Sequence, residues 1–198
     1  MKKIIVGLCL SLCASFSSAA VISFDDLSGN PADTIGDAYE GFNWGLMASV
    51  SNVEFPGSGF EQGVVSGDKA AFNQFGMDAS IALAAGGTFD FIGAFFTAAW
   101  IGDYFHELSF EGYLDGALLY STSSAFAITD TTASWIQLDW AGIDQLNIYS
   151  NLAGWDQWVM DDFTVDIHAV SVPESSSLVL LLMGVLSLFF ARARVNLQ

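Results

Sequence analysis

Apolar and polar residues alternate along much of the middle of the chain. The alternation is clearest in residues 107–114, 136–140 and 145–149, where apolar side chains recur at alternate positions. A period of two is typical of strands that bury one face. Asp115-Gly116 comes directly after the first segment and predicts a type I′ hairpin turn, because that turn needs positive φ at both central residues.

Glycine-containing turn signals separate further apolar segments, and no stretch shows a convincing helical period. The chain is therefore predicted to be all-β, with a jelly-roll-like antiparallel β-sandwich of about 8 to 10 strands. This single domain is expected to span residues 21–171, between an N-terminal signal peptide and a C-terminal transmembrane helix.

The N-terminal end has the order of a secretory signal. Lys2 and Lys3 precede an uncharged apolar run at residues 4–14, and small residues follow it. The run is short for a membrane span of about 30 Å. The pattern predicts a signal peptide over residues 1–20, cleaved after Ala20, with a retained N-terminal anchor as the alternative.

A second apolar segment, residues 178–191, lies close to the C-terminus and is followed at once by Arg192 and Arg194. It predicts a transmembrane helix with a basic tail. Because the domain before it is exported, the arginines are expected in the cytoplasm, as the positive-inside rule requires.

The motif Val172-Pro173-Glu174, the apolar helix and the basic tail closely resemble the PEP-CTERM sorting signal, here residues 172–198. Ser175 stands where that motif has a second proline. The resemblance implies recognition by an exosortase-type membrane protease in a Gram-negative bacterium that makes exopolysaccharide. It also implies a transient membrane anchor, followed by release to the cell surface or extracellular matrix. An ordinary tail anchor is the alternative.

The segment Gln74-Phe75-Gly76-Met77-Asp78 is similar to a QFxxD pattern in one subgroup of the ectodomains attached to such tails. This likeness, with weaker similarities along most of the domain, implies a fold and a location. It brings no activity with it.

Charge narrows the choice of partners. The chain has 5 basic and 22 acidic residues and a formal net charge of −17. Four basic residues belong to the ends, so residues 21–171 keep only Lys69 against 21 acidic groups, all except Glu174, and a net charge of −20. Such a surface repels phosphates, which excludes nucleic acid and favours cations or neutral glycans. Solubility alone is the alternative reason for the charge.

Catalytic motifs are absent from the sequence. Both cysteines, Cys9 and Cys13, lie in the predicted signal peptide, and the only histidines are His106 and His168, without partners at metal or triad spacing. Glycoside hydrolysis needs two carboxylates about 5 to 9.5 Å apart, whereas same-face residues four strand positions apart are separated by about 13 Å. The domain is predicted to be non-enzymatic, with a secreted carbohydrate-active enzyme as the alternative.

Two carboxylates are expected on apolar strand faces. Asp161 shares a predicted face with Val159 and Phe163, and Asp26 shares one with Ile22 and Phe24. Buried carboxylates need partners, so a structural Ca²⁺ held by Asp26 and Asp161, with Asp25 and Asp162 beside them, is one prediction. A bulge that turns each Asp outward, or backbone N–H groups that satisfy it, are the alternatives.

Large aromatic rings flank two polar loops. Trp100 and Tyr104 bracket residues 101–103, and Trp155 and Trp158 bracket residues 156–157. Exposed rings beside amides and carboxylates could stack on sugars, whereas rings that cap the sandwich core would be buried. The sequence therefore predicts an exported surface or matrix protein, with a possible glycan platform and an association with exopolysaccharide or biofilm.

Overall fold

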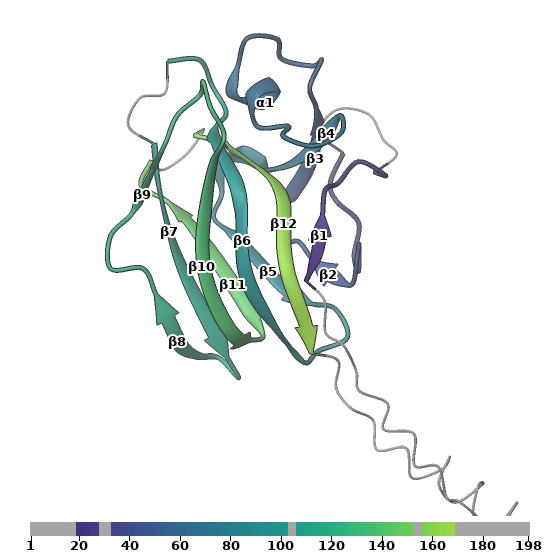
Figure 1. Cartoon of the computed structure of the whole chain (residues 1–198), viewed down its shortest axis with the longest axis vertical. Coiled ribbons are helices and arrows are strands. Elements are labelled where there is room, and N and C mark those ends of the chain that lie inside the picture. Colours follow the sequence, from purple (N-terminus) through teal and green to yellow (C-terminus); the bar gives the residue numbers. More distant parts are fainter. Residues whose placement is uncertain (1–18, 28–32, 103–105, 153–155, 169–198) are drawn as a thin grey trace, which may run out of the picture. The chain divides into compact units, whose positions relative to one another are not determined.

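The computed structural model describes residues 19–27, 33–102, 106–152 and 156–168 (Figure 1). In these residues the chain forms two antiparallel sheets and almost no helix, which confirms the prediction of an all-β sandwich. No helix within these ranges is long and apolar enough to cross a membrane. The predicted segment 178–191 lies outside them, as do the sorting motif and nearly all of the predicted signal peptide.

Each sheet contains six strands. Sheet A has the order β10 (Ser134–Ile143), β6 (Thr88–Ala98), β12 (Trp158–His168), β4 (Lys69–Asn73) and β3 (Met47–Ser51), and β1 (Ala20–Ile22) pairs with β12. Sheet B has the order β2 (Phe42–Asn43), β5 (Ala79–Leu83), β11 (Gln145–Ser150), β7 (His106–Leu114) and β8 (Ala117–Ser121), and β9 (Phe126–Ile128) pairs with β7. Two short helices complete the described elements: α1 (Gly59–Gln62) and the 3₁₀ helix η1 (Gln74–Gly76).

The described residues thus contain twelve strands, more than the 8 to 10 that the sequence predicts. The difference comes from β1, β2 and β9, which have two or three residues each. Strands of this length are too short to show a period of two, so only their tertiary pairing identifies them.

The core lies between the inner faces of the two sheets. The alternation predicted for β7 and β11 is confirmed, since Leu108, Phe110, Leu146 and Ile148 are fully buried. Aromatic rings join the sheets: the ring centroids of Phe96 on β6 and Phe110 on β7 are 5.5 Å apart. Edge-to-face pairs of this kind stabilise a core beyond their buried area.

The predicted hairpin turn is also confirmed. Asp115 and Gly116 have φ values of 51° and 75° and join β7 to β8, with Leu114 opposite Ala117. Positive φ at both positions is what a type I′ turn requires.

A second, smaller apolar cluster lies on the outer face of sheet A. Val50 on β3, Phe72 on β4 and Val159 on β12 pack there with Phe60 of α1. The segment with α1 therefore covers this part of the sheet, at the upper end of the molecule in Figure 1. This cover positions the candidate site.

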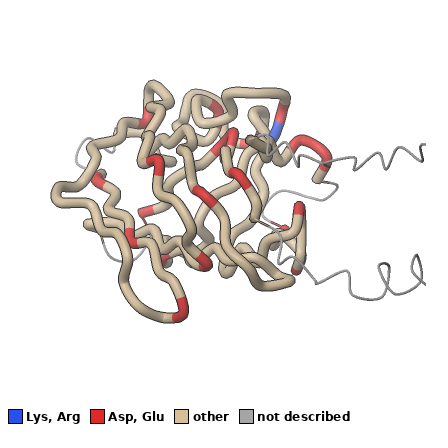
Figure 2. The backbone as a smooth tube through the Cα atoms, turned by 60° about the horizontal axis from the view of Figure 1, so that its bottom comes forward, with Lys and Arg blue, Asp and Glu red and all other residues tan. Residues whose placement is uncertain are grey.

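Acidic residues are spread around the described part of the chain, and Figure 2 shows them in red with a single blue basic position. That position is Lys69, whose ammonium group donates a hydrogen bond to the carbonyl oxygen of Leu27.

Candidate functional site

Helix α1 and the turn before it carry two of the aromatic rings of the candidate site, Phe60 and Phe55. Its N-cap is Ser58, whose hydroxyl oxygen accepts a hydrogen bond from the Phe60 amide at 3.2 Å. Gly59 allows the helix to lie directly on β6, because a Cβ at that position would be 1.6 Å from the carbonyl oxygen of Ala98. This close packing places Phe60 in the small apolar cluster on the outer face of sheet A and leaves Phe55 at the surface. The centroids of the two rings are 4.7 Å apart.

Trp100 follows the end of β6 and faces the same pair of rings. Its ring centroid is 5.0 Å from that of Phe60 and 5.7 Å from that of Phe55, both nearly edge to face. The indole N–H donates to the side-chain oxygen of Gln157 at 3.2 Å, which fixes the orientation of the ring. Trp100 is nevertheless 42% exposed.

Phe75 completes the group from η1. It has φ 58° and ψ 18°, a left-handed conformation that is uncommon for a bulky residue. The buried Asn73 holds this turn on both sides, because its amide donates to Met77 O at 2.9 Å and accepts from Trp158 N at 2.7 Å. The turn presents the Phe75 ring to solvent, with 61% of its surface exposed.

These elements enclose a hollow of about 330 Å³, called the aromatic hollow below. The described residues that line it are Phe55, Phe60, Phe72, Gln74, Phe75, Trp100 and Gln157. None of them is charged, and the only polar side chains are two glutamine amides. Accessible rings with a few fixed polar groups are typical of small-molecule sites.

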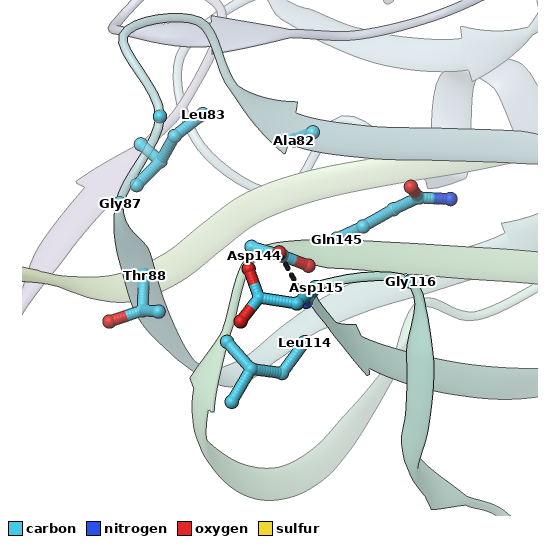
Figure 3. Close-up of a pocket in the computed structure, with 10 residues that line it drawn as sticks. Ala82, Leu83, Gly87, Thr88, Leu114, Asp115, Gly116, Asp144 and Gln145 are labelled. Carbon is cyan, nitrogen blue, oxygen red and sulfur yellow. Dashed lines mark hydrogen bonds between the residues drawn. The ribbon is translucent and has the colours of Figure 1, made fainter.

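A larger hollow of about 570 Å³ lies at the opposite end of β6, around the turns between strands (Figure 3). Asp115 and Asp144 face each other there, and the Asp115 amide donates to the Asp144 carboxylate at 2.7 Å. Its described lining contains no aromatic ring. Because stacking on a sugar needs an accessible ring, the aromatic hollow is the better candidate for glycan binding.

The predicted platform residues have different positions. Trp100 is accessible, as a platform requires. Trp158 is fully buried and packs on Phe96, so it drops out of the predicted platform: it lies on β12 with its ring between the sheets. Tyr104 and Trp155 lie outside the described residues.

Sequence reasoning missed the phenylalanines of the hollow. Phe75 is inside the QFxxD-like segment, and Gln157 is inside the loop that the tryptophans bracket, so both were near a recognised signal. Phe55 and Phe60 do not lie near any signal recognised in the sequence. Their position depends on the contact between α1 and sheet A, which joins residues far apart in the chain.

The predicted buried carboxylate at Asp161 is confirmed, since the side chain is fully buried. It is satisfied by the backbone: one oxygen accepts from the amides of Val65 at 2.7 Å and Ser66 at 2.9 Å, and the other from Asp162 at 2.7 Å. Burial raises the pKa of Asp161 to about 6, although these hydrogen bonds act in the opposite direction.

Asp25 and Asp162 bind the same loop. Asp25 accepts from the amides of Asp68 at 2.8 Å and Lys69 at 3.1 Å, and Asp162 accepts from the Ser66 hydroxyl at 2.7 Å. Together with Asp161, these carboxylates fasten residues 65–69 to β12 and to the chain that follows β1.

Asp26 does not point into the core as predicted. Phe24 has φ 65°, which breaks the strand alternation, and Asp26 is exposed and accepts from the Tyr39 hydroxyl at 2.5 Å. Asp26 and Asp161 thus have separate partners, and no group of three or more ligand side chains suited to a metal occurs among the described residues. These contacts do not fit the Ca²⁺ site that the sequence predicts.

The fold and the hollow define an antiparallel β-sandwich with an aromatic surface site. No family model and no curated protein matches the chain. Solved structures that are similar in fold include the three that follow. The CBM22-1 xylan-binding domain of Paenibacillus barcinonensis Xyn10C is 12% identical, with 78% of this chain and 97% of that domain covered and a TM-score of 0.43.

The CBM22-1-CBM22-2 tandem domain of the same Xyn10C is 14% identical, with 79% of this chain and 47% of the tandem covered and a TM-score of 0.44. TmCBM61 in complex with β-1,4-galactotriose is 13% identical, with 64% and 87% covered and a TM-score of 0.34. Likeness at this level does not extend to function, so the functional argument depends on the aromatic hollow.

Proposed function

We propose that this is an exported, non-enzymatic carbohydrate-binding protein that holds neutral glycans at the aromatic hollow. The observation that carries the proposal is the group of three accessible rings, Phe55, Phe75 and Trp100, around one uncharged hollow. Large apolar rings at a surface lose the benefit of burial unless a ligand covers them.

The shape of the site suits a sugar ring. Trp100 stands nearly edge to face against Phe55, so their exposed surfaces meet at an angle and can contact two faces of one ligand. The Gln157 amide accepts from Trp100 and donates to Asn73 O at 3.4 Å, which holds it at the rim. Amide groups at a rim are suited to sugar hydroxyls.

Charge supports a neutral ligand. A net charge of −20 over residues 21–171 repels uronic acids and sulfated sugars at low ionic strength. The described lining of the hollow contains no carboxylate or histidine, whereas glycoside hydrolysis needs a pair of carboxylates at the bond to be cleaved. The charge thus supports a neutral ligand, and the lining supports binding without catalysis.

The location is proposed from the two ends of the chain. The signal peptide predicted over residues 1–20 and the PEP-CTERM-like tail over residues 172–198 support export, sorting by an exosortase-type protease and a place in the extracellular polysaccharide or biofilm. In cells with that protease, intact-mass measurement should show surface protein without the segment from Leu178 onward. Recovery of Arg194 in that protein would contradict the sorting proposal.

Binding can be tested with the full chain in a polyoxyethylene detergent, which has no sugar headgroup to compete. Isothermal titration against soluble xylan, galactan, mannan and mixed β-glucan, with alginate as the anionic comparison, should reveal a neutral glycan that binds. We expect Phe75→Ala and Trp100→Ala each to weaken that binding at least tenfold. Met77→Ala is the matched control, because Met77 is 51% exposed beside the same turn but does not line the hollow.

Unchanged affinity in both ring variants, or no neutral glycan bound, would contradict the proposal. New reducing ends after incubation would indicate the alternative, a carbohydrate-active enzyme. An equal loss of affinity in Met77→Ala would show that the turn, rather than the rings, is being perturbed.

A further inference from the structure

A hydrogen-bonded group of polar side chains lies on the outer face of sheet B, far in the fold from the aromatic hollow. It consists of Gln145, Asn147 and Tyr149 on β11 and Glu111 and Tyr113 on β7, called the polar row below. These residues alternate with buried neighbours along both strands, which places their side chains on the outer face.

Contacts join the whole row. The Gln145 amide donates to Asn147 at 2.7 Å, Asn147 donates to the Tyr149 hydroxyl at 3.1 Å, and Tyr149 donates to the Glu111 carboxylate at 2.9 Å. The Tyr113 hydroxyl donates to the same Glu111 oxygen. Two phenols on one carboxylate oxygen fix the orientation of both rings before any ligand arrives.

Strand pairing gives the row its dimensions. Asn147 lies directly opposite Glu111, and Gln145 lies opposite Tyr113. The row therefore covers two neighbouring strands about 5 Å apart and extends about 14 Å along β11. On β5, the outer-face neighbours of Asn147 and Gln145 are the small residues Ser80 and Ala82, so nothing bulky rises beside the row there.

The chemistry of the row selects the kind of ligand. Amides, phenols and a carboxylate offer donors and acceptors for pairs of hydroxyl groups, and the two tyrosines add ring surface. The row itself contains no large aliphatic side chain, whereas a protein partner would need an apolar centre to bury. On β8, Leu118 is 54% exposed and lies opposite Tyr113, so an apolar neighbour borders the row at one end. The net charge of −20 disfavours an anionic ligand.

We propose that the polar row is a second glycan-binding surface, specific for the hydroxyl-rich side of a neutral polysaccharide. The aromatic hollow borders the outer face of sheet A, where Phe72 and α1 lie, and the polar row is on the outer face of sheet B. One molecule then holds two glycan chains on opposite faces and cross-links them. The cross-linking depends on the function proposed for the hollow; the second surface does not.

The test begins from a Phe75→Ala/Trp100→Ala background, which removes the hollow. In the full chain, titrated with the same neutral polysaccharides, this background should retain one class of binding sites. Adding Glu111→Gln should weaken the retained binding at least tenfold, because the carboxylate that orients both tyrosines is lost. Glu107→Gln is the matched control, since Glu107 is exposed on the same face of β7 outside the row, and should change affinity less than twofold.

Four further outcomes separate the two proposals. No binding in the background, or binding that Glu111→Gln leaves intact, overturns the second surface and leaves the hollow. Binding that depends on Glu111 while the ring variants have no effect overturns the hollow and keeps the second surface. Only the unmodified chain should raise the viscosity of a long polysaccharide solution. An equal rise with Phe75→Ala/Trp100→Ala, or with Glu111→Gln in the unmodified chain, overturns cross-linking.

The variants must also be folded. Thermal midpoints within about 2 °C of the parent confirm this, and a Tyr149→Phe variant replaces Glu111→Gln if that one unfolds.

Discussion

At the scale of single residues, two tryptophans that look equivalent in the sequence have opposite roles. Trp100 is 42% exposed at the aromatic hollow, whereas Trp158 is fully buried between the sheets with its ring centroid 5.7 Å from that of Phe96. The difference follows from position. Trp158 begins β12 and points inward, and Trp100 lies two residues beyond the end of β6.

Alanine substitution should separate these roles. We expect Trp158→Ala to lower the free energy of unfolding by about 3–5 kcal/mol, because it leaves a large cavity in the core. Trp100→Ala should cost only about 1 kcal/mol while weakening glycan binding at the aromatic hollow. Urea unfolding measures both, and equal losses of stability in the two variants would contradict the assignment.

At the scale of elements, the hollow depends on the close packing of α1 against β6. The four-residue helix is too short to be stable alone, so its packing on sheet A maintains it. Phe60 holds the helix to sheet A by packing in the small apolar cluster. Phe55 packs on the Phe60 ring, so its position at the edge of the hollow depends on the helix.

Gly59→Ala tests this contact between α1 and β6. The added methyl group would meet backbone atoms, Ala98 O at 1.6 Å and Ala98 C at 2.8 Å, which cannot rotate away as a side chain can. We expect a loss of about 1–3 kcal/mol in unfolding free energy and a drop in glycan affinity as well. Gln62→Ala, an exposed change on the same helix, should affect neither. Normal glycan affinity in Gly59→Ala would show that the hollow does not need this contact.

At the scale of the whole molecule, the excess of carboxylates makes stability depend on pH. Burial raises the pKa of Asp161 from its ordinary 3.8 to about 6, and burial raises the pKa of Glu54 as well. Between pH 3.8 and about pH 6, the native state keeps the proton on Asp161, whereas the unfolded chain has released it. This stabilisation is complete below 3.8 and is lost as the pH rises through about 6.

Asp25 acts in the other direction at lower pH. Burial would raise its pKa, but hydrogen bonds from the Asp68 amide, the Ser23 hydroxyl and the Lys69 amide hold it below the ordinary value. Its stabilisation is therefore present above the ordinary value of 3.8 and is lost as the pH falls further.

We expect the thermal midpoint to be higher at pH 5 than at pH 7.5, because both the Asp161 proton and weaker charge repulsion favour the folded state. About 0.5 M salt should reduce the part due to repulsion, since it screens exposed charges more than a buried group. Asp161→Asn should remove most of the difference in thermal midpoint that remains between pH 5 and pH 7.5 in salt. Calorimetric melting measures these differences, and a midpoint that rises from pH 5 to pH 7.5 would contradict them.

Local sequence by itself determined the longer strands of this protein, although not the short strands β1, β2 and β9. Alternation in residues 107–114 and 145–149 specifies which side chains turn inward, because successive side chains of a strand point to opposite faces. Asp115-Gly116 specifies a hairpin, because few other pairs adopt positive φ twice. The net charge of −20 over residues 21–171 predicts, before any fold is known, that nucleic acid is repelled.

Only the tertiary structure decided the candidate site and the fate of the buried carboxylates. The hollow joins Phe55, Phe75 and Trp100 from three separate segments, and a period within one strand cannot specify contacts between segments. Asp161 has no basic partner nearby in the sequence, and two of the three backbone amides that satisfy it, those of Val65 and Ser66, are about 95 residues away. Every residue type except proline has a backbone N–H, so the sequence carries no mark of which amides will meet a carboxylate. The packing of the loop against β12 selects them.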